Sequence, residues 1–439
     1  MIRPRLVTAA VLTAVLGAAA VVAAPSAAPA PTTVTKYPVT AAATIYTGAA
    51  FDACTAPPLS TMNAWLGSPY RAIGVYVGGE NRSCAQPNLT ARWVSDVTAL
   101  GWSLIPIYFG RQAPCSDRTT ATKISTNTAT ATTQGTDAAN DAIAQATALG
   151  MSPGSPLYYD MENYDPAVAT CRTAVLTFLS AWVGRLHAKG YLAAVYANLS
   201  SGAKHLAQYY TSSSYARPDI LWVARWDGSP RLTGLAGVSD RYWASHQRAK
   251  QYRGGHDETY GGVTLNIDND QVDAAVATVA RAYTTELGTT NRRSGPSTTT
   301  KAIAPIPAGT PVELLCQTHG RARAGTEIWD KLADGSYVSD HFVNTPSNTT
   351  YSPGIPRCYY PYQVTVSDSV SLRKSPSGSS TRVGYLYVGG LAWVKCQLKG
   401  TTVGSTRVWD RLLNNPYVSD YYVATESNTT YTAPIPYCY

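Results

Sequence analysis

Two carboxylates stand two residues apart at the end of an apolar run, in the segment Tyr158-Tyr159-Asp160-Met161-Glu162. Successive side chains of a β-strand point to opposite faces, so Asp160 and Glu162 would share one face, with Cα atoms about 6.6 Å apart. Two carboxyl groups held this close cannot both ionise easily, and the pKa of one of them is raised until it can donate a proton near neutral pH. Such a pair is suited to cleaving a sugar acetal. The alternative is ordinary solvated acids at a strand end, before a helix that Asp165-Pro166 caps.

The segments that would position this pair alternate between strand and helix. Helical patterns such as 88–100, 136–149 and 166–189 fill the intervals between apolar runs. Eight strand-then-helix units in about 240 residues predict an α/β fold, a (β/α)8 TIM-type barrel, with an open doubly wound sheet as the alternative. The runs that we interpret as strands are 47–52, 72–77, 103–109, 156–162, 192–198, 220–226, 241–247 and 262–268.

In such a barrel the catalytic residues come from the C-terminal ends of the strands, on one rim. Asp52 ends the first strand, and Asp160 and Glu162 end the fourth, so we assign these three residues to catalysis. With three acids on one rim, we expect Glu162 to stay protonated well above its ordinary pKa of about 4.3.

Aromatic and polar residues at the other strand ends would form a cleft that stacks sugar rings and hydrogen-bonds their hydroxyls. Each aromatic residue alone is equally compatible with core packing, and it is their convergence on one rim that favours a binding site. The residues assigned to substrate binding are Tyr76, Tyr108, Tyr196, Asn198, Trp226, Gln247, Asp268 and Asp270.

Several of these segments resemble the family-25 glycoside hydrolases, lysozymes that cut the glycan of peptidoglycan. The resemblance is closer to a glycoside-hydrolase-like domain of secreted actinobacterial proteins without an established activity, and it covers about residues 45–285. It implies Glu162 as the general acid, with Asp160 and Asp52 as electrostatic partners or as nucleophile and base. A cleft that only binds carbohydrate is the alternative. The segments that carry the resemblance are Ala50-Phe51-Asp52-Ala53-Cys54, Tyr158-Tyr159-Asp160-Met161-Glu162, Tyr196-Ala197-Asn198, Trp222-Val223-Ala224-Arg225-Trp226 and Asp268-Asn269-Asp270.

The N-terminus has the layout of a secretory signal peptide. Arg3 and Arg5 precede an Ala-rich apolar run, which predicts a signal peptide at residues 1–30 and a linker at 31–44, with an uncleaved membrane anchor as the alternative. The formal charge of +8 is dispersed, unlike the basic patch typical of nucleic-acid binders. We therefore expect a secreted, extracellular or cell-wall-associated monomer that binds peptidoglycan-type carbohydrate, with neither a nucleic-acid partner nor a membrane contact after cleavage.

The sequence after residue 286 contains an internal repeat with an offset of 80 residues. Trp329-Asp330 recurs as Trp409-Asp410, and Tyr337-Val338-Ser339-Asp340 recurs as Tyr417-Val418-Ser419-Asp420. This predicts two small all-β modules, residues 286–359 and 360–439, after a barrel of residues 45–285. They resemble bacterial SH3-like modules, which implies attachment to the cell wall, and the alternative is that they only space the barrel.

The eight cysteines divide evenly between the barrel and the repeat, which fits an oxidising compartment. The repeat predicts Cys316–Cys358 and Cys396–Cys438, one bridge in each module. The four barrel cysteines allow three pairings, of which we favour Cys54–Cys84 with Cys115–Cys171. No Cys-x-x-Cys pair or phosphate-cradling motif is present, so we expect neither a metal nor another cofactor, and a nucleotide-binding signalling protein has no support.

Overall fold

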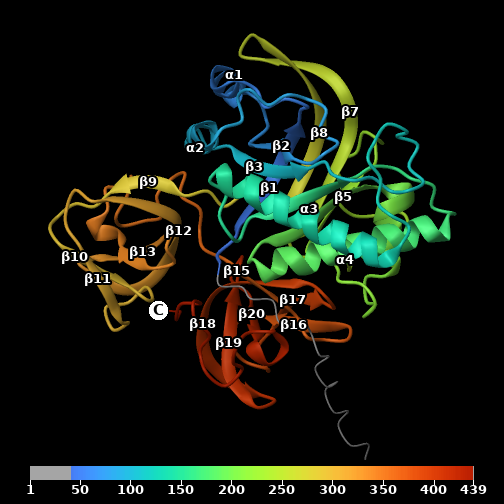
Figure 1. Cartoon of the computed structure of the whole chain (residues 1–439). Helices are drawn as coiled ribbons and strands as arrows, with labels where there is room; N and C mark the ends of the chain where they lie inside the picture. The colour runs from blue at the N-terminus through green and yellow to red at the C-terminus, as the bar shows by residue number, and fades with distance from the viewer. Residues whose placement is uncertain (1–40, 439) are drawn as a thin grey trace, which may run out of the picture. The chain divides into compact units, whose positions relative to one another are not determined.

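A computed structural model describes residues 41–438 of the 439-residue chain. The predicted signal peptide, residues 1–30, and most of the predicted linker, residues 31–44, lie outside the described residues. The chain forms a closed barrel of eight strands, followed by two six-stranded sheets (Figure 1). Among residues 41–438, none of the helices has the length and apolar character needed to cross a membrane.

The eight barrel strands follow one another around the barrel in chain order. Neighbouring strands from β1 to β7 pair in parallel, and β8 closes the barrel by pairing with β1. The predicted barrel is confirmed, and the open doubly wound sheet is wrong because such a sheet has two free edges. The strands are β1 Thr44–Asp52, β2 Ala72–Gly78, β3 Ser103–Tyr108, β4 Pro156–Met161, β5 Leu192–Asn198, β6 Ile220–Ala224, β7 Arg248–Tyr260 and β8 Val263–Val276.

Helices connect the successive strands from β1 to β6. The longest, α3 and α4, pack on the strands through buried small and aromatic residues such as Ala139, Phe178 and Trp182. The Asn127 side chain caps α3 by accepting a hydrogen bond from Thr130 N at 3.0 Å. The helices are α1 Leu59–Ala64, η1 Trp65–Gly67, α2 Ala91–Ala99, α3 Thr128–Ala148, α4 Ala169–Ala188, η2 Leu199–Ala203 and α5 Lys204–Gln208.

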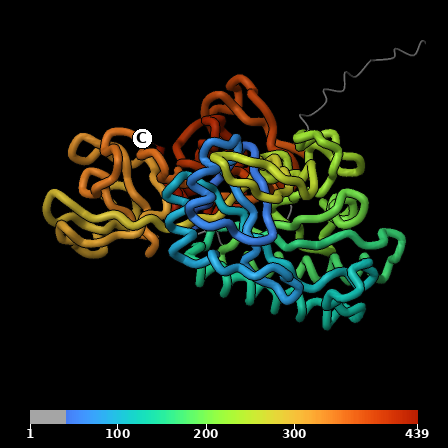
Figure 2. The backbone as a smooth tube through the Cα atoms, turned by 90° about the horizontal axis from the view of Figure 1, so that it is seen from above, coloured from blue at the N-terminus to red at the C-terminus, as the bar shows by residue number. Residues whose placement is uncertain are grey.

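The last part of the barrel differs from the predicted strand-then-helix pattern. Residues 241–247, predicted as the seventh strand, form turns, and β7 begins at Arg248. β7 and β8 form an antiparallel hairpin whose loop residues, Gly261 and Gly262, have φ values of 56° and 76°. Two adjacent residues with positive φ make a tight hairpin loop, which glycine permits without strain. The predicted eighth strand is therefore the first half of β8, which runs antiparallel to β1. In Figure 2 the yellow tube of the hairpin lies beside the blue tube of the N-terminal segment.

The alternation of side chains in β4 separates two core layers. Tyr159 and Met161 pack against the helices, whereas Tyr158 points into the barrel beside Trp222. Asp160 has the same parity as Tyr158, so it belongs to the interior face, as the period-2 pattern predicts. The interior cluster continues into the second six-stranded sheet, where Trp393 is buried.

The two C-terminal sheets have one topology. Each order is given from the strand that comes first in the sequence. The orders are β9-β12-β13-β14-β10-β11 and β15-β18-β19-β20-β16-β17, and each strand of one sheet has a counterpart at the same place in the other. The first sheet comprises β9 Arg281–Thr284, β10 Thr290–Arg293, β11 Ala302–Ile306, β12 Pro311–Arg323, β13 Thr326–Leu332 and β14 Tyr337–Ser339, followed by η3 Asp340–Phe342. The second comprises β15 Tyr360–Gln363, β16 Ser369–Arg373, β17 Arg382–Tyr387, β18 Leu391–Val403, β19 Thr406–Leu412 and β20 Tyr417–Ser419, followed by η4 Asp420–Tyr422.

Each sheet has the same buried polar centre. In the first, Gln317 Nε2 donates to Asp330 Oδ1 and Asp340 Oδ1, both at 2.9 Å. In the second, Gln397 makes the equivalent bonds to Asp410 and Asp420. All four predicted disulfides are confirmed, namely Cys54–Cys84, Cys115–Cys171, Cys316–Cys358 and Cys396–Cys438.

Candidate active site

An open cleft of about 410 Å³ lies at the rim of the barrel where β1 and β4 end. Two cavities elsewhere are larger, about 590 and 550 Å³, but the clustered carboxyl groups line this one. Chemistry and not size therefore identifies the candidate site. Its polar and aromatic lining consists of Asp52, Tyr76, Arg82, Phe109, Arg118, Asp160, Glu162, Tyr196, Trp226, Gln251, Asn266 and Asp268.

Asp52 and Asp268 face each other directly across the junction of β1 and β8. Gln251, on β7, bridges them: its Nε2 donates to Asp52 Oδ2 at 2.8 Å and to Asp268 Oδ2 at 3.4 Å. Burial, followed by the charge of Asp268, raises the pKa of Asp52 to about 7. Burial also raises the pKa of Asp268 to about 6, although His256 opposes the shift. This pair therefore titrates near neutral pH.

The structure places Asp160 deeper in the barrel than Glu162. Asp160 is 4% exposed, and its Oδ1 is buried without a hydrogen-bond partner. Burial, then the charges of Glu162 and Asp52, raises the pKa of Asp160 well above its ordinary value. An ionised carboxylate at this position would be desolvated and would have an oxygen without a hydrogen-bond partner, so the site favours the protonated form of Asp160.

The backbone around these two acids is held by one buried side chain. Gln112 Nε2 donates to Asp160 O at 2.8 Å, and Gln112 Oε1 accepts from Glu162 N at 2.9 Å. The amide thus fixes the chain where β4 ends and the side chain of Glu162 enters the cleft. Gln112 is fully buried and touches the acids only through their backbone, so it is a positioning residue.

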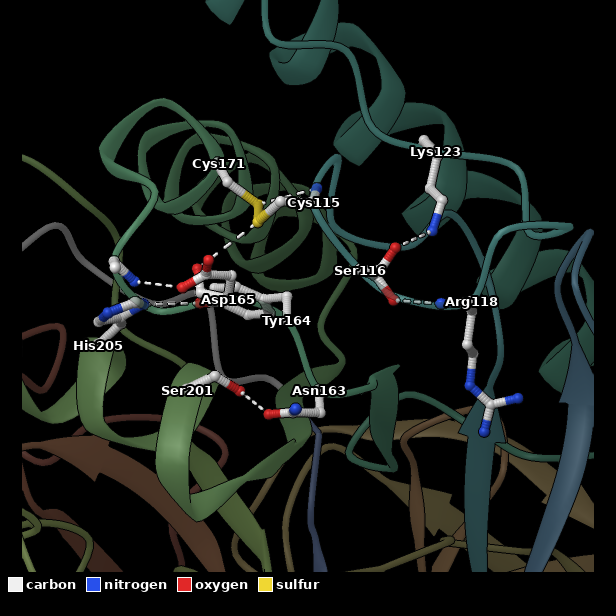
Figure 3. Close-up of a disulfide and its surroundings, with 11 residues drawn as sticks. Cys115, Ser116, Arg118, Lys123, Asn163, Tyr164, Asp165, Cys171, Ser201 and His205 are labelled. Atoms are coloured by element: carbon white, nitrogen blue, oxygen red, sulfur yellow. Dashed lines mark hydrogen bonds between the residues drawn. A yellow bond between two sulfur atoms is a disulfide. The ribbon is translucent and has the colours of Figure 1, made fainter.

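Glu162 forms an ion pair with Arg118, which comes from the loop between β3 and α3. The disulfide Cys115–Cys171 ties this loop to α4, and Lys123 Nζ donates to Ser116 O at 3.0 Å (Figure 3). The Arg118 guanidinium also lies 5.4 Å from the centre of the Phe109 ring. These contacts hold a cation at the mouth of the cleft, against the carboxylate that projects furthest into it.

Aromatic side chains supply the apolar part of the cleft. Trp226 is 66% exposed, yet its Nε1 donates to Gln251 Oε1 at 2.8 Å, which orients the ring. Gly254 lies beneath this ring, and a Cβ there would come within 2.7 Å of it. Tyr196 donates to the same Gln251 oxygen at 2.9 Å. An exposed, oriented indole beside carboxylates is a surface on which a sugar ring can stack.

Four residues assigned to substrate binding lie outside the cleft lining. Tyr108 faces α3, where its hydroxyl donates to Asp141 Oδ2 at 2.8 Å. Asn198 caps η2 by accepting from Ser200 N. Gln247 lies at the N-terminal end of β7, where it accepts from Leu391 N of the second sheet, because the predicted seventh strand was placed too early. Asp270 is fully buried and accepts from Trp222 Nε1 at 3.1 Å. Tyr76, Tyr196, Trp226 and Asp268 line the cleft with the three assigned acids.

Gln251, Gln112 and Arg118 were not found by sequence reasoning. Gln251 lies on β7, which pairs with β8 in an antiparallel hairpin. The sequence Gly261-Gly262 marks the loop of this hairpin, so counting back from the loop could have located β7. Gln112 and Arg118 lie in a loop whose path depends on a disulfide, and no local pattern marks them. Within residues 41–438, no group of His, Cys, Asp and Glu side chains has the arrangement of a metal site.

Residues 63–272 match the family model described as the Rv2525c-like, glycoside hydrolase-like domain. No curated protein matches the chain. Solved structures that match the chain share low identity with it. The Mycobacterium tuberculosis Tat-secreted protein Rv2525c, in complex with L-tartrate, is 16% identical over 52% of this chain and 96% of its own, with a TM-score of 0.37. The modular autolysin LytC from Streptococcus pneumoniae is 14% identical over 51% and 46%, with a TM-score of 0.34.

The modular Cpl-1 endolysin, complexed with a peptidoglycan analogue, is 11% identical over 88% of this chain and 99% of its own, with a TM-score of 0.31. The family match includes Asp160, Glu162 and Asp268, whereas Asp52 precedes it. Over residues 63–272, the barrel of this chain thus matches the Rv2525c-like, glycoside hydrolase-like domain.

Proposed function

We propose that the barrel is a glycoside hydrolase that cleaves peptidoglycan-type glycan in the manner of a lysozyme. The observation that carries the proposal is the convergence of Asp52, Asp160, Glu162 and Asp268 on one open cleft beside the exposed ring of Trp226. An acetal cleavage site needs a protonated carboxyl group and an ionised one within one cleft. The raised pKa of Asp160 favours a protonated carboxyl group, and the ion pair with Arg118 favours an ionised Glu162.

In this mechanism the Asp160/Glu162 pair shares the proton that goes to the glycosidic oxygen. The bond from that oxygen to the anomeric carbon breaks, and the leaving sugar departs as an alcohol. Asp52 and Asp268 stabilise the positive charge that develops on the sugar. Water then adds to the anomeric carbon and returns a proton to the carboxylates, which restores the starting state. Because the two acids are coupled, their apparent pKa values belong to the pair.

A second candidate is carbohydrate binding without cleavage. The Arg118–Glu162 ion pair favours it, because a carboxylate paired with a guanidinium is not free to accept and deliver a proton. Substrate would have to displace Arg118, and the 50% exposure of the Arg118 side chain leaves room for that movement.

We further propose that the protein is exported and held at the cell wall. The signal peptide at residues 1–30 would direct export, and four disulfides fit an oxidising compartment. The two C-terminal modules, predicted as residues 286–359 and 360–439, would act as SH3-like wall-binding units of a monomer. The first module also includes β9, Arg281–Thr284, which pairs with β12. The disulfide within each module and the matching buried centres support two modules of one design.

The proposed function is tested with Glu162→Gln on purified peptidoglycan. We expect release of new reducing ends to fall about 10²- to 10⁴-fold, because the amide keeps the side-chain shape but cannot transfer the proton. Affinity for the glycan should stay within a few-fold of the wild type. Asp137→Asn, which removes an exposed charge on α3, is the matched control and should retain activity. If the wild type and the variant are both inactive and bind the glycan equally well, the hydrolase is contradicted and the carbohydrate-binding protein is supported.

A further inference from the structure

The cavity of about 590 Å³ lies between the two β-modules and is larger than the barrel cleft. Both modules contribute to it. The first supplies His319, Tyr351 and Arg357, and the second supplies Lys395, Arg411 and Asn415. Two arginines, one lysine and one histidine therefore line a single cavity, far along the chain from the barrel acids.

These cations have no carboxylate partner within residues 41–438. None of the ion pairs among the described residues includes Arg357, Lys395 or Arg411. The one acid that lines the cavity, Glu327, lies 3.5 Å from His319. Arg411 Nε is buried without a hydrogen-bond partner, although buried donors in proteins are ordinarily bonded.

The like charges repel one another across the cavity. Burial, followed by the charges of Arg411 and Arg357, lowers the pKa of Lys395. Burial also lowers the pKa of His319, with Lys395, Arg357 and Arg411 adding to the effect against Glu327. Mutual repulsion among partly buried cations is unfavourable to the fold, and a bound anion would relieve it.

The cluster of Arg357, Lys395 and Arg411 is not simply a feature that both copies of the module share. With the offset of 80 residues, Lys395 corresponds to Leu315 and Arg357 corresponds to Tyr437. The counterpart of Arg411 is Lys331, which is buried in the first module and donates to the Tyr337 hydroxyl at 3.1 Å. The cations thus occur at one junction only, at positions where the other copy has apolar or internally bonded residues.

We propose that this junction binds a phosphate-bearing anion with at least two negative charges. Arginine forks match phosphate oxygens, and Arg357 is held in place over the Tyr351 ring, 4.3 Å from its centre. Lys395, bonded to Asn415 Oδ1 at 2.9 Å, adds a third charge. The volume exceeds that needed for one inorganic ion, so the ligand is a larger phosphate compound or a segment of a phosphate polymer.

The test is calorimetric titration of the full chain with pyrophosphate at a constant ionic strength of about 0.15 M. We expect saturable binding that weakens about tenfold or more in Lys395→Leu and in Arg357→Tyr, because each change removes one charge-assisted contact. Both changes introduce the residue of the other module, so the fold should accept them. Lys374→Ala, which removes an exposed charge of the second module outside the cavity, is the matched control.

Binding that is absent from the wild type, or that is equally strong in all variants, would overturn the site, and so would an equal loss in Lys374→Ala. A glycerol-phosphate oligomer that binds more tightly than pyrophosphate would identify a polymer, and the reverse order a small soluble anion. Glu162→Gln should leave this binding unchanged, so the test is independent of glycan cleavage.

Discussion

Asp160→Asn is expected to abolish glycan cleavage and, in the same protein, to raise the free energy of unfolding at alkaline pH. The activity should fall about 10²- to 10⁴-fold, because the amide cannot supply the proton that the acid pair transfers. The stability should rise because the carboxyl group is buried with an unpartnered oxygen. A gain in stability with a loss of activity is the trade-off expected when a residue of a destabilised active site is replaced.

The direction of the stability change follows from the pKa of Asp160. Its pKa in the folded protein is raised well above the ordinary value of 3.8, so the folded state binds the proton more tightly than the unfolded state. The stabilisation is complete below about 3.8 and is lost as the pH rises through the folded pKa. Chemical denaturation at pH 5 and pH 8 should therefore show a smaller difference for Asp160→Asn than for the wild type. A variant that is destabilised equally at both pH values would contradict the burial of an ionisable group.

The second prediction concerns the alkaline limb of the pH profile of kcat/KM. Burial is the largest cause of the raised pKa of Asp160, the charge of Asp52 raises it further, and the charge of Arg118 lowers it. Asp52→Asn should therefore move the alkaline limb to lower pH, and Arg118→Gln should move it to higher pH. The two changes remove charges of opposite sign and leave a neutral polar side chain at each position.

The two variants control for each other, because their alkaline limbs are expected to move in opposite directions. Any general disturbance of the cleft would slow both variants but would not move their limbs apart. Limbs that stay at the wild-type position in both variants would show that neither charge acts on the proton donor. A limb that stays at the wild-type position in Asp52→Asn alone would place Asp52 outside the electrostatic reach of the pair.

Much of this site could be predicted because the alternation of side chains along each strand determines which residues face the cleft. The period-2 alternation of Tyr158 and Asp160 places both on the interior face, and Asp52 ends a strand that pairs with the next one in chain order. The offset of 80 residues identified two modules and two of the disulfides. These inferences needed only strand geometry and sequence identity between copies.

Other features depend on tertiary structure that no local pattern encodes. Gln251 reaches Asp52 because β7 pairs with an antiparallel β8, so the direction of the last strand had to be known first. Arg118 reaches Glu162 only through a loop tied by a disulfide to α4. Tyr108 was assigned to the cleft because tyrosine is a residue on which a sugar ring can stack. Its side chain lies on the outer face of β3 and contacts α3.

The most direct test of glycan cleavage is mass spectrometry of the material that the wild-type protein releases from purified peptidoglycan. Cleavage of a glycosidic bond predicts soluble fragments with new reducing ends, each pair heavier by one water than the glycan from which it came. The same digestion with Asp160→Asn should yield no such fragments. Recovery of intact glycan saturably bound to the wild-type protein would contradict the hydrolase and leave the cleft as a carbohydrate-binding site.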